Sequence, residues 1–446
     1  MKLLSGLTPS KRNPRSKATK RWEPEVEAQF SLSEKDMIGG MVVEKVDPFT
    51  MEKECISWDS TGMVLSLEGG EYRRLVEISH KMSSLKPLSG ALSASTAKSL
   101  IIKWITAVRT GATRSSLSEW QAEELAKTLR ARTVCVPIAW LHVQSEVRLG
   151  KFRLVPLNSA LKDAWRDRIN QKKADTVPEW KPRGQLAHAF NMAWAGLIVE
   201  VFGDSKARES QALQAALEVC GLLRFFWPGN SVLGSRCFVL PLGMESPPQR
   251  TVIEIEGDCP TSLSEGLIGP PGEPIILSDK YLSDVGRSFS AVGSLITRES
   301  PSEFQRRLLA SLLLYTRNSL HTDVVDRLIA VLVALESILL RDKSEPIQSS
   351  LAQRLAVVTK DTVEERAELI GAVRRCYDIR STFLHHGLRK DEDRAAVELL
   401  LKTAWLFFMD CILNHEHVLS MQEFNARVDA ALLGGPRVDL HVSGKK

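Results

Sequence analysis

The sequence predicts an α+β protein in which a mixed α/β N-terminal region is followed by an all-α C-terminal helical bundle. Three observations predict this class. Short runs rich in β-forming residues alternate with amphipathic helical stretches up to residue 262. From residue 285 onward, apolar residues recur at the helical spacings of three and four. Between the two regions, the run Gly-Pro-Pro-Gly-Glu-Pro at residues 269–274 can continue neither a helix nor a central strand.

The chain has 446 residues, which is enough for two or three domains with sizeable cores. We expect five segments along it. They are a basic tail (1–22), a mixed α+β region of one domain or two subdomains (25–262), a Gly/Pro-rich linker (263–284), a helical bundle (285–430) and a flexible tail (431–446).

Composition excludes several classes of protein. Hydrophobic residues make up 43% and charged residues 25%, as in ordinary globular proteins. The longest apolar stretch, residues 328–340, is shorter than the ~20 residues of a membrane span, and Lys2 is not followed by a signal-peptide core. We therefore expect a cytoplasmic protein without membrane contact. The seven cysteines are scattered and include no Cys-x-x-Cys, which argues against a disulfide framework or a zinc ribbon.

The net charge of +5 is unevenly distributed. Residues 1–22 contain seven Lys and Arg and no acid, so the remainder carries −2. The tail is either an arm that contacts nucleic acid or a solubilising leader, and the leader is favoured because short basic N-termini are common. Seven of the ten tryptophans lie between Trp58 and Trp194. Core packing is favoured for them over stacking on RNA bases.

In the N-terminal region, helical periodicity is found over 93–131 and 210–226. Residues 133–143 and 147–157 are predicted as strands, and Pro137 suggests an edge strand or a bulge in the first of them. Shorter strands are predicted at 63–67, 197–202, 237–242 and 251–255.

The C-terminal region contains five recognisable helices, at 303–318, 323–340, 345–358, 361–384 and 392–413. The second is apolar around almost its whole circumference, which predicts the central buried helix of the bundle. It contains Glu336, and a carboxylate is costly there unless it is paired or belongs to a site. Glu336 therefore either caps or pairs with an arginine at the rim of the bundle, or it has a functional role.

A second group of polar residues ends the helix at 361–384. Arg380 is followed by His385, His386 and Gly387, and a glycine in that position is typical of a helix C-terminus. On a regular helix Arg380 and His385 lie about 140° apart, so they do not share a face. They can converge if the helix ends or bends near His385, or if two such helices meet across a two-fold axis. The histidines can also simply interact with the helix dipole and with solvent.

Other chemistry is not indicated by the sequence. His415 and His417 are separated by two positions and point apart on a helix, and no nearby Cys or Asp completes a ligand set. We expect exposed helix-end histidines there, no metal and no cofactor. The sequence contains neither Gly-x-Gly-x-x-Gly nor a P-loop, so a nucleotide-binding site of either kind is not predicted.

The C-terminal 130 residues resemble the HEPN superfamily, and more narrowly its Apea-like branch. The family carries an arginine and a histidine with four to six residues between them near the end of a long helix, and a polar residue follows the arginine. In this chain Ser381 occupies the position after the arginine, where asparagine is most frequent in the family. This departure concerns the strength of the polar contact that the residue at that position makes. The matching runs are Asp326-Arg327-Leu328-Ile329, Ala334-Leu335-Glu336, Tyr377-Asp378-Ile379-Arg380-Ser381 and His385-His386-Gly387.

This resemblance implies a metal-independent endoribonuclease that cleaves single-stranded RNA by 2′-OH attack, as a homodimer through the C-terminal bundle. Arg380 would bind the scissile phosphate, and His385 or His386 would be the general acid or base. Ser381, Glu336, Asp378 and Tyr377 would support them, with Glu336 orienting Arg380. The resemblance suggests a role in stress or anti-phage defence, and the N-terminal region would have an unknown ligand or partner. The alternatives are a non-catalytic HEPN module for dimerisation or for RNA or protein binding, and a metal-dependent enzyme at the C-terminal histidines.

Overall fold

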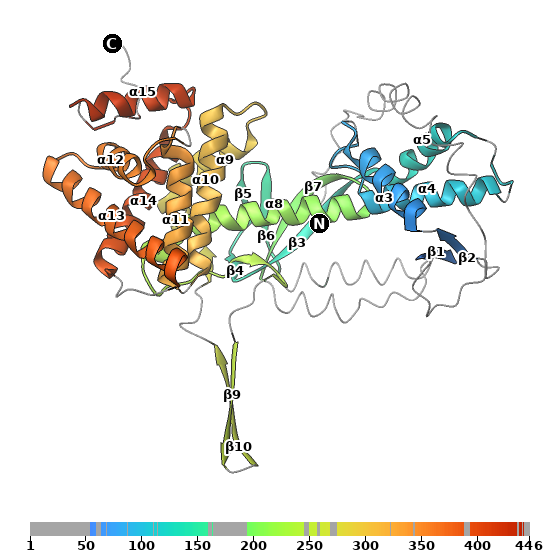
Figure 1. Ribbon diagram of the computed structural model, residues 1–446, viewed down its shortest axis with the longest axis horizontal. Coiled ribbons are helices and arrows are strands. Elements are labelled where there is room, and N and C mark those ends of the chain that lie inside the picture. The colour runs from blue at the N-terminus through green and yellow to red at the C-terminus, as the bar shows by residue number, and fades with distance from the viewer. Residues whose placement is uncertain are drawn as a thin grey trace. The chain divides into compact units, whose positions relative to one another are not determined.

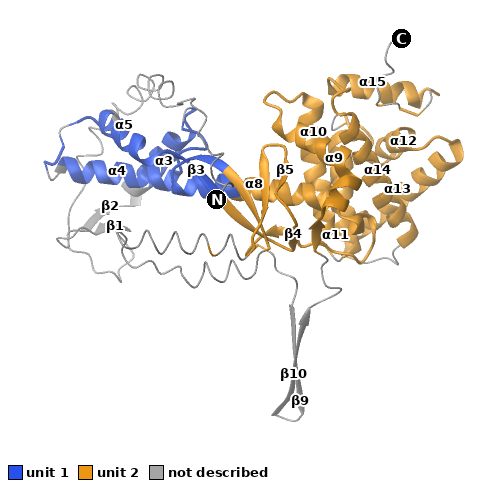
Figure 2. Ribbon diagram, turned by 180° about the vertical axis from the view of Figure 1, so that it is seen from behind, with its two compact units in different colours: residues 1–134, 200–212 blue, residues 135–199, 213–446 orange. Residues whose placement is uncertain are grey.

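The computed structural model is α+β (Figure 1). It describes residues 54–58, 64–67, 69–158, 163, 194–244, 249–256, 259–267 and 274–440, except for 87, 110, 114, 322, 342–343, 388–392, 435–436 and 439. The predicted basic tail at 1–22 lies outside these residues. Contacts group the chain into two compact units, which are residues 1–134 with 200–212, and residues 135–199 with 213–446 (Figure 2). No helix in the described part of the chain is both long and apolar enough to span a bilayer.

The first unit is built around three helices, α3 (Gly69–Ser84), α4 (Ala94–Arg109) and α5 (Leu117–Thr128). The helical prediction for 93–131 is confirmed, with a break where Gly111 adopts a φ of 70° and Ser116 caps α5. The helices enclose an apolar core that contains Leu75, Ile101 and Trp104. A short antiparallel hairpin, β1 (Glu54–Trp58) with β2 (Val64–Leu67), precedes α3.

The main sheet has five strands in the order β5-β6-β7-β3-β8. They are β3 (Arg130–Ala139), β5 (Val147–Leu149), β6 (Phe152–Pro156), β7 (Ala195–Gly203) and β8 (Leu240–Pro241). Of the two alternatives for Pro137, an edge strand or a bulge, the edge strand is wrong, because β3 lies between β7 and β8. The missing N–H of proline is tolerated there because Pro137 uses its carbonyl, which accepts from Leu242 N at 2.9 Å.

The predicted strand at 147–157 is a tight hairpin of β5 and β6. Gly150 turns the chain with a φ of 59°, and its backbone lies directly against Gly293 of α9 (Asp279–Thr297). A Cβ on Gly150 would lie 2.5 Å from the carbonyl oxygen of Gly293. The apolar positions shift from 147 and 149 before the turn to 152 and 154 after it, a change of phase that the single-strand prediction did not take into account.

The predicted linker at 263–284 contains three regular elements. Strand β10 (Cys259–Leu267) pairs antiparallel with β9 (Gln249–Glu256). Strand β11 (Ile275–Leu277) pairs in parallel with β4 (Leu141–Val143), and α9 begins at Asp279. The prediction failed because β10 is rich in Ser, Gly and Pro, which locally favour a loop.

Seven helices follow β11 in the described residues. After α9 they are α10 (Glu303–Tyr315), α11 (Val324–Leu339), α12 (Ile347–Thr359), α13 (Val363–His386), α14 (Arg394–Asn414) and α15 (Met421–Leu432). The five predicted helices are all present, whereas α9 and α15 had not been delimited. Helix α11 is the apolar helix of the prediction, and nine of its sixteen residues are buried.

The helices belong to the same compact unit as residues 135–199, which we had expected to group with the N-terminal region. One tie between segments of this unit is the fully buried Arg327 of α11. Its guanidinium donates to the carbonyl oxygens of Asn230 at 2.8 Å and Val232 at 2.6 Å, and to the side chain of Asn318 at 3.0 Å. These bonds fasten the turn η2 (Pro228–Ser231), which follows helix α8 (Ser205–Phe225), to the helical layer.

Part of the predicted flexible tail at 431–446 is ordered and packs against the protein. Val438 and Leu440 are buried, and Val438 N donates to the carbonyl oxygen of Val357 at 3.2 Å. Arg437 Nε donates to Val358 O at 2.9 Å. The two apolar side chains explain the difference, because their burial offsets the entropy lost on ordering this segment.

Candidate functional site

Two helices present the predicted site residues, α11 with Glu336 and α13 with the Arg380 and histidine motif. Helix α13 begins at a capping box in which Thr362 and Glu365 satisfy each other's backbone N–H groups. It ends at Gly387, which adopts the left-handed conformation with a φ of 64° and donates its N–H to Phe383 O. The predicted C-terminal glycine is therefore confirmed.

Glu336 receives two hydrogen bonds from α13. Arg380 Nη1 donates to Oε1 of Glu336 at 2.8 Å, and the hydroxyl of Tyr377 donates to the same oxygen at 2.7 Å. The guanidinium carbon of Arg380 also lies 5.8 Å from the centre of the Tyr377 ring. Of the two interpretations of Glu336, the pairing with an arginine is observed, and its partner is the arginine of the motif.

The cluster of Glu336, Tyr377 and Arg380 is half-buried. The side chains of Glu336 and Arg380 are 18% and 24% exposed. Burial, and then the hydrogen bond to the Glu336 carboxylate, raises the pKa of Tyr377 well above its ordinary value. Tyr377 therefore stays protonated and remains a donor to Glu336 across the physiological pH range.

The guanidinium of Arg380 keeps donors that the protein does not use. Its Nε is buried without a hydrogen-bond partner, and no partner is found for Nη2 among the described residues. A guanidinium has five N–H groups in one plane, so the bond from Nη1 to Glu336 leaves donors unused. Because Nε is buried, Nη2 is the nitrogen left for a second anion.

The two histidines lie in the last turn of α13 and are exposed to solvent. Their ring centres are 6.5 Å apart. Helical structure continues through His386, so the helix end does not bring the His385 ring back to Arg380, and the described residues show no contact between them. The side chains of Ser381 and Asp378 are exposed and make no hydrogen bond within the described part of the chain. The site therefore contains one assembled cluster and four separate polar residues.

The remaining histidines do not form a comparable group. His417 is exposed, but His415 is buried, contrary to the expectation of an exposed ring. Its Nδ1 lies 2.8 Å from Ile412 O and its Nε2 lies 3.0 Å from Ser294 Oγ, which ties α14 to α9. No set of three or more potential metal ligands comes together in the described residues.

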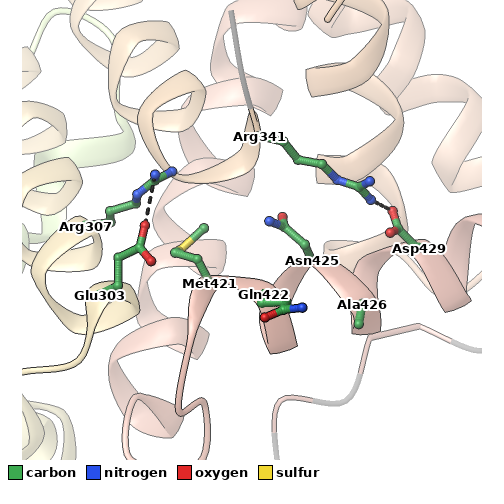
Figure 3. Close-up of a pocket in the computed structure, with 8 residues that line it drawn as sticks. All are labelled: Glu303, Arg307, Arg341, Met421, Gln422, Asn425, Ala426 and Asp429. Carbon is green, nitrogen blue, oxygen red and sulfur yellow. Dashed lines mark hydrogen bonds and ion pairs between the residues drawn. The ribbon is translucent and has the colours of Figure 1, made fainter.

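A hollow that the sequence did not indicate lies between α10 and α15 (Figure 3). Ion pairs lie on opposite sides of it, Glu303 with Arg307 at 3.0 Å and Arg341 with Asp429, while Gln422 and Asn425 lie between them. Each arginine is neutralised by its own carboxylate, so the hollow offers no free cation to a phosphate. None of the predicted site residues lines it.

Comparison of the chain with protein-family models, with curated proteins and with solved structures gives no match in any of the three.

Proposed function

We propose that this protein is a metal-independent endoribonuclease of the HEPN type that cleaves single-stranded RNA in the cytoplasm. The observation that carries the proposal is the cluster on α11 and α13. Glu336 holds Arg380 through one nitrogen and leaves other guanidinium donors unused, and two exposed histidines follow on the same helix. A positioned guanidinium and imidazoles near neutral pH are the groups that phosphodiester transfer in RNA needs.

In the proposed reaction the 2′-oxygen of RNA forms a bond to phosphorus while the bond from phosphorus to the 5′-oxygen breaks. One imidazole takes the 2′-OH proton and a protonated imidazole supplies a proton to the leaving 5′-oxygen. Arg380 donates to the phosphate oxygens, whose negative charge grows in the transition state. The products are a 2′,3′-cyclic phosphate and a 5′-hydroxyl.

Because Arg380 and the histidines do not meet within one chain, the proposal requires two copies of the bundle. A homodimer would place the arginine of one chain near the histidines of the other, and Ser381 and Asp378 at the exposed surface of α13 would then face the substrate. The mixed N-terminal region would precede this catalytic bundle as a sensor or target selector, in a stress or anti-phage response.

The test uses the full-length protein with labelled single-stranded RNA in EDTA. Arg380→Ala and His385→Ala should each reduce cleavage by about 100-fold or more, as expected for loss of a transition-state interaction or a general acid–base. Arg374→Ala removes an exposed arginine from the same helix and should leave the rate unchanged. Equal cleavage by the wild type and all three variants would contradict the proposal. His386→Ala, assayed beside them, identifies the working histidine.

A second candidate is a non-catalytic helical module for dimerisation or for binding RNA or protein. The pairing of Arg380 with Glu336 favours it, because a guanidinium already neutralised by a carboxylate can be purely structural. It predicts no cleavage by the wild type and stable self-association in sedimentation equilibrium.

A further inference from the structure

Positive charge is concentrated in the helical part of the first unit. Residues 69–134, from the start of α3 to the end of this segment, contain eleven Lys and Arg against five Glu. Their net charge of +6 exceeds the +5 of the whole chain. Three of the five acids lie on α5, whereas α4 has three basic residues and no acid, and α3 has three basic residues and two glutamates. Because the net charge of the chain beyond residue 22 is only −2, this local excess of positive charge is not apparent from the net charge.

Four basic or titratable residues of α3 lie on one solvent-facing side, here called the basic face and defined by Arg73, Arg74, His80 and Lys81. At 100° per residue, Arg73, Arg74 and Lys81 lie within an arc of about 100°, and Arg73 and Lys81 are about 12 Å apart along the axis. All four side chains are exposed, and Glu77 is the single acid among them. The opposite side of α3 contributes Leu75 and Met82 to the core, which fixes the direction of the basic face.

Two of these cations have no side-chain partner among the residues that the structure describes. No ion pair or side-chain hydrogen bond is found for Arg73 or Lys81 within the described ranges, nor for Lys86 just beyond the helix. Elsewhere in the described residues many surface arginines are paired, among them Arg153 with Glu146 and Arg427 with Glu423. Unpaired cations of one sign on a rigid helix attract a polyanion and release its counterions on binding.

We propose that the basic face of α3 binds the phosphate backbone of single-stranded RNA. The positive charge of the face indicates a polyanionic binding partner. The choice of RNA as this partner rests on the proposed function. This surface would hold the substrate without taking part in cleavage, and without base specificity, because Lys and Arg bonds to phosphates position a nucleic acid but do not read its sequence.

The experiment measures binding separately from cleavage. Full-length protein is titrated into a fluorescein-labelled 20-nucleotide 2′-O-methyl RNA, which lacks the 2′-OH nucleophile, and anisotropy is followed at several salt concentrations. The test variant is Arg73→Gln with Lys81→Gln. Its matched control is Lys280→Gln with Lys402→Gln, which removes the same charge from exposed positions in the second unit.

The test variant should bind the RNA about tenfold more weakly than the wild type. The slope of the logarithm of its binding constant against the logarithm of the salt concentration should be shallower by roughly 0.7 for each phosphate that the variant no longer neutralises. The control should bind like the wild type, and Arg73→Lys with Lys81→Arg should restore binding. Equal affinity of the test variant and the wild type, or equal losses in test and control, would overturn the proposal. So would tighter binding to anionic phospholipid vesicles than to RNA. If binding behaves as expected and unmodified RNA is not cleaved, the inference stands and the ribonuclease proposal fails.

Discussion

Tyr377 and Arg380, almost one helical turn apart on α13, donate hydrogen bonds to the same carboxylate oxygen of Glu336 on α11, at 2.7 and 2.8 Å. In a mostly apolar layer the Glu336 carboxylate thereby gains two donors and the Tyr377 hydroxyl gains an acceptor, while Arg380 is satisfied only at Nη1. The arrangement ties Nη1 of Arg380 to α11 and so restricts the position of a guanidinium that could bind phosphate. The first prediction separates the structural contribution of this cluster from its chemistry.

Glu336→Ala leaves both α13 donors without their acceptor and should lower the free energy of unfolding by about 2 kcal/mol. Tyr377→Phe removes one neutral donor and should cost about 1 kcal/mol. Urea unfolding at pH 7 measures both. Asp326→Ala, at an exposed carboxylate of the same helix, is the control and should change stability by less than about 0.5 kcal/mol. Equal effects at Glu336 and Asp326 would show that the cluster is not stabilising.

The buried Arg327 should be far more sensitive than a surface arginine. Arg327→Leu leaves the carbonyl oxygens of Asn230 and Val232 without a donor, so we expect a loss of about 3 kcal/mol or more. Arg306→Leu removes an exposed guanidinium that donates to Pro301 O at 2.8 Å, and it should cost less than about 1 kcal/mol. Thermal and urea unfolding of the two variants provide the comparison, and similar losses would argue against an anchoring role for Arg327.

Two glycines of α9 should respond in opposite directions to alanine. A Cβ on Gly286 meets nothing within 4 Å, so Gly286→Ala should stabilise the helix by up to about 1 kcal/mol. A Cβ on Gly293 would lie 2.9 Å from the backbone nitrogen of Gly150, so Gly293→Ala should be destabilising by about 1 kcal/mol or more. Differential scanning calorimetry gives the sign of each change. A stabilising Gly293→Ala would contradict the close packing of the β5–β6 turn on α9.

Acid should lower the free energy of unfolding of the first unit, because it protonates the carboxylate of Asp204. Burial disfavours the charged carboxylate, but hydrogen bonds from the backbone of Ser93 at 2.6 Å and Ala207 at 2.8 Å outweigh it, and the pKa of Asp204 lies below its ordinary value of 3.8. A carboxylate with a lowered pKa stabilises the folded state above its unfolded pKa, and this contribution is lost as pH falls through the folded value.

Stability of the wild type should therefore fall below about pH 4, with Asp204 contributing at most about 1.4 kcal/mol per pH unit. Asp204→Asn should lose that part of the slope and be less stable than the wild type at pH 7. Urea unfolding from pH 2 to pH 7 measures the slope. Parallel curves for the two proteins would exclude Asp204 as a source of the pH dependence.

Local features of the fold were predictable from the sequence, and long-range ones were not. The apolar periodicity of 323–340 and the glycine after His386 depend on neighbouring residues, and both α11 and the cap at Gly387 are as predicted. The hairpin at Gly150 was missed because each of its strands has only two apolar positions, so the change of phase between Leu149 and Phe152 is a weak signal. Strand β10 was missed because its Ser, Gly and Pro content is typical of loops, and pairing with β9 overrides that tendency.

The candidate site shows the same division. Glu336 was recognisable as a carboxylate that needs a partner, since an unpaired charge in an apolar helix is costly. The residues that satisfy it are 41 and 44 positions away, and a pattern within one helix cannot specify which face of another helix it meets. The buried position of His415 and the hollow between α10 and α15 depend on tertiary packing and left no comparable signal in the sequence.

The most direct test of the central claim is the chemistry of the RNA ends formed by the full-length protein in EDTA. The account predicts fragments that end in a 2′,3′-cyclic phosphate and begin with a 5′-hydroxyl, formed by the wild type and absent with Arg380→Ala. Intact RNA after incubation with the wild type, or fragments with 3′-hydroxyl ends that form only when a divalent metal is added, would contradict it.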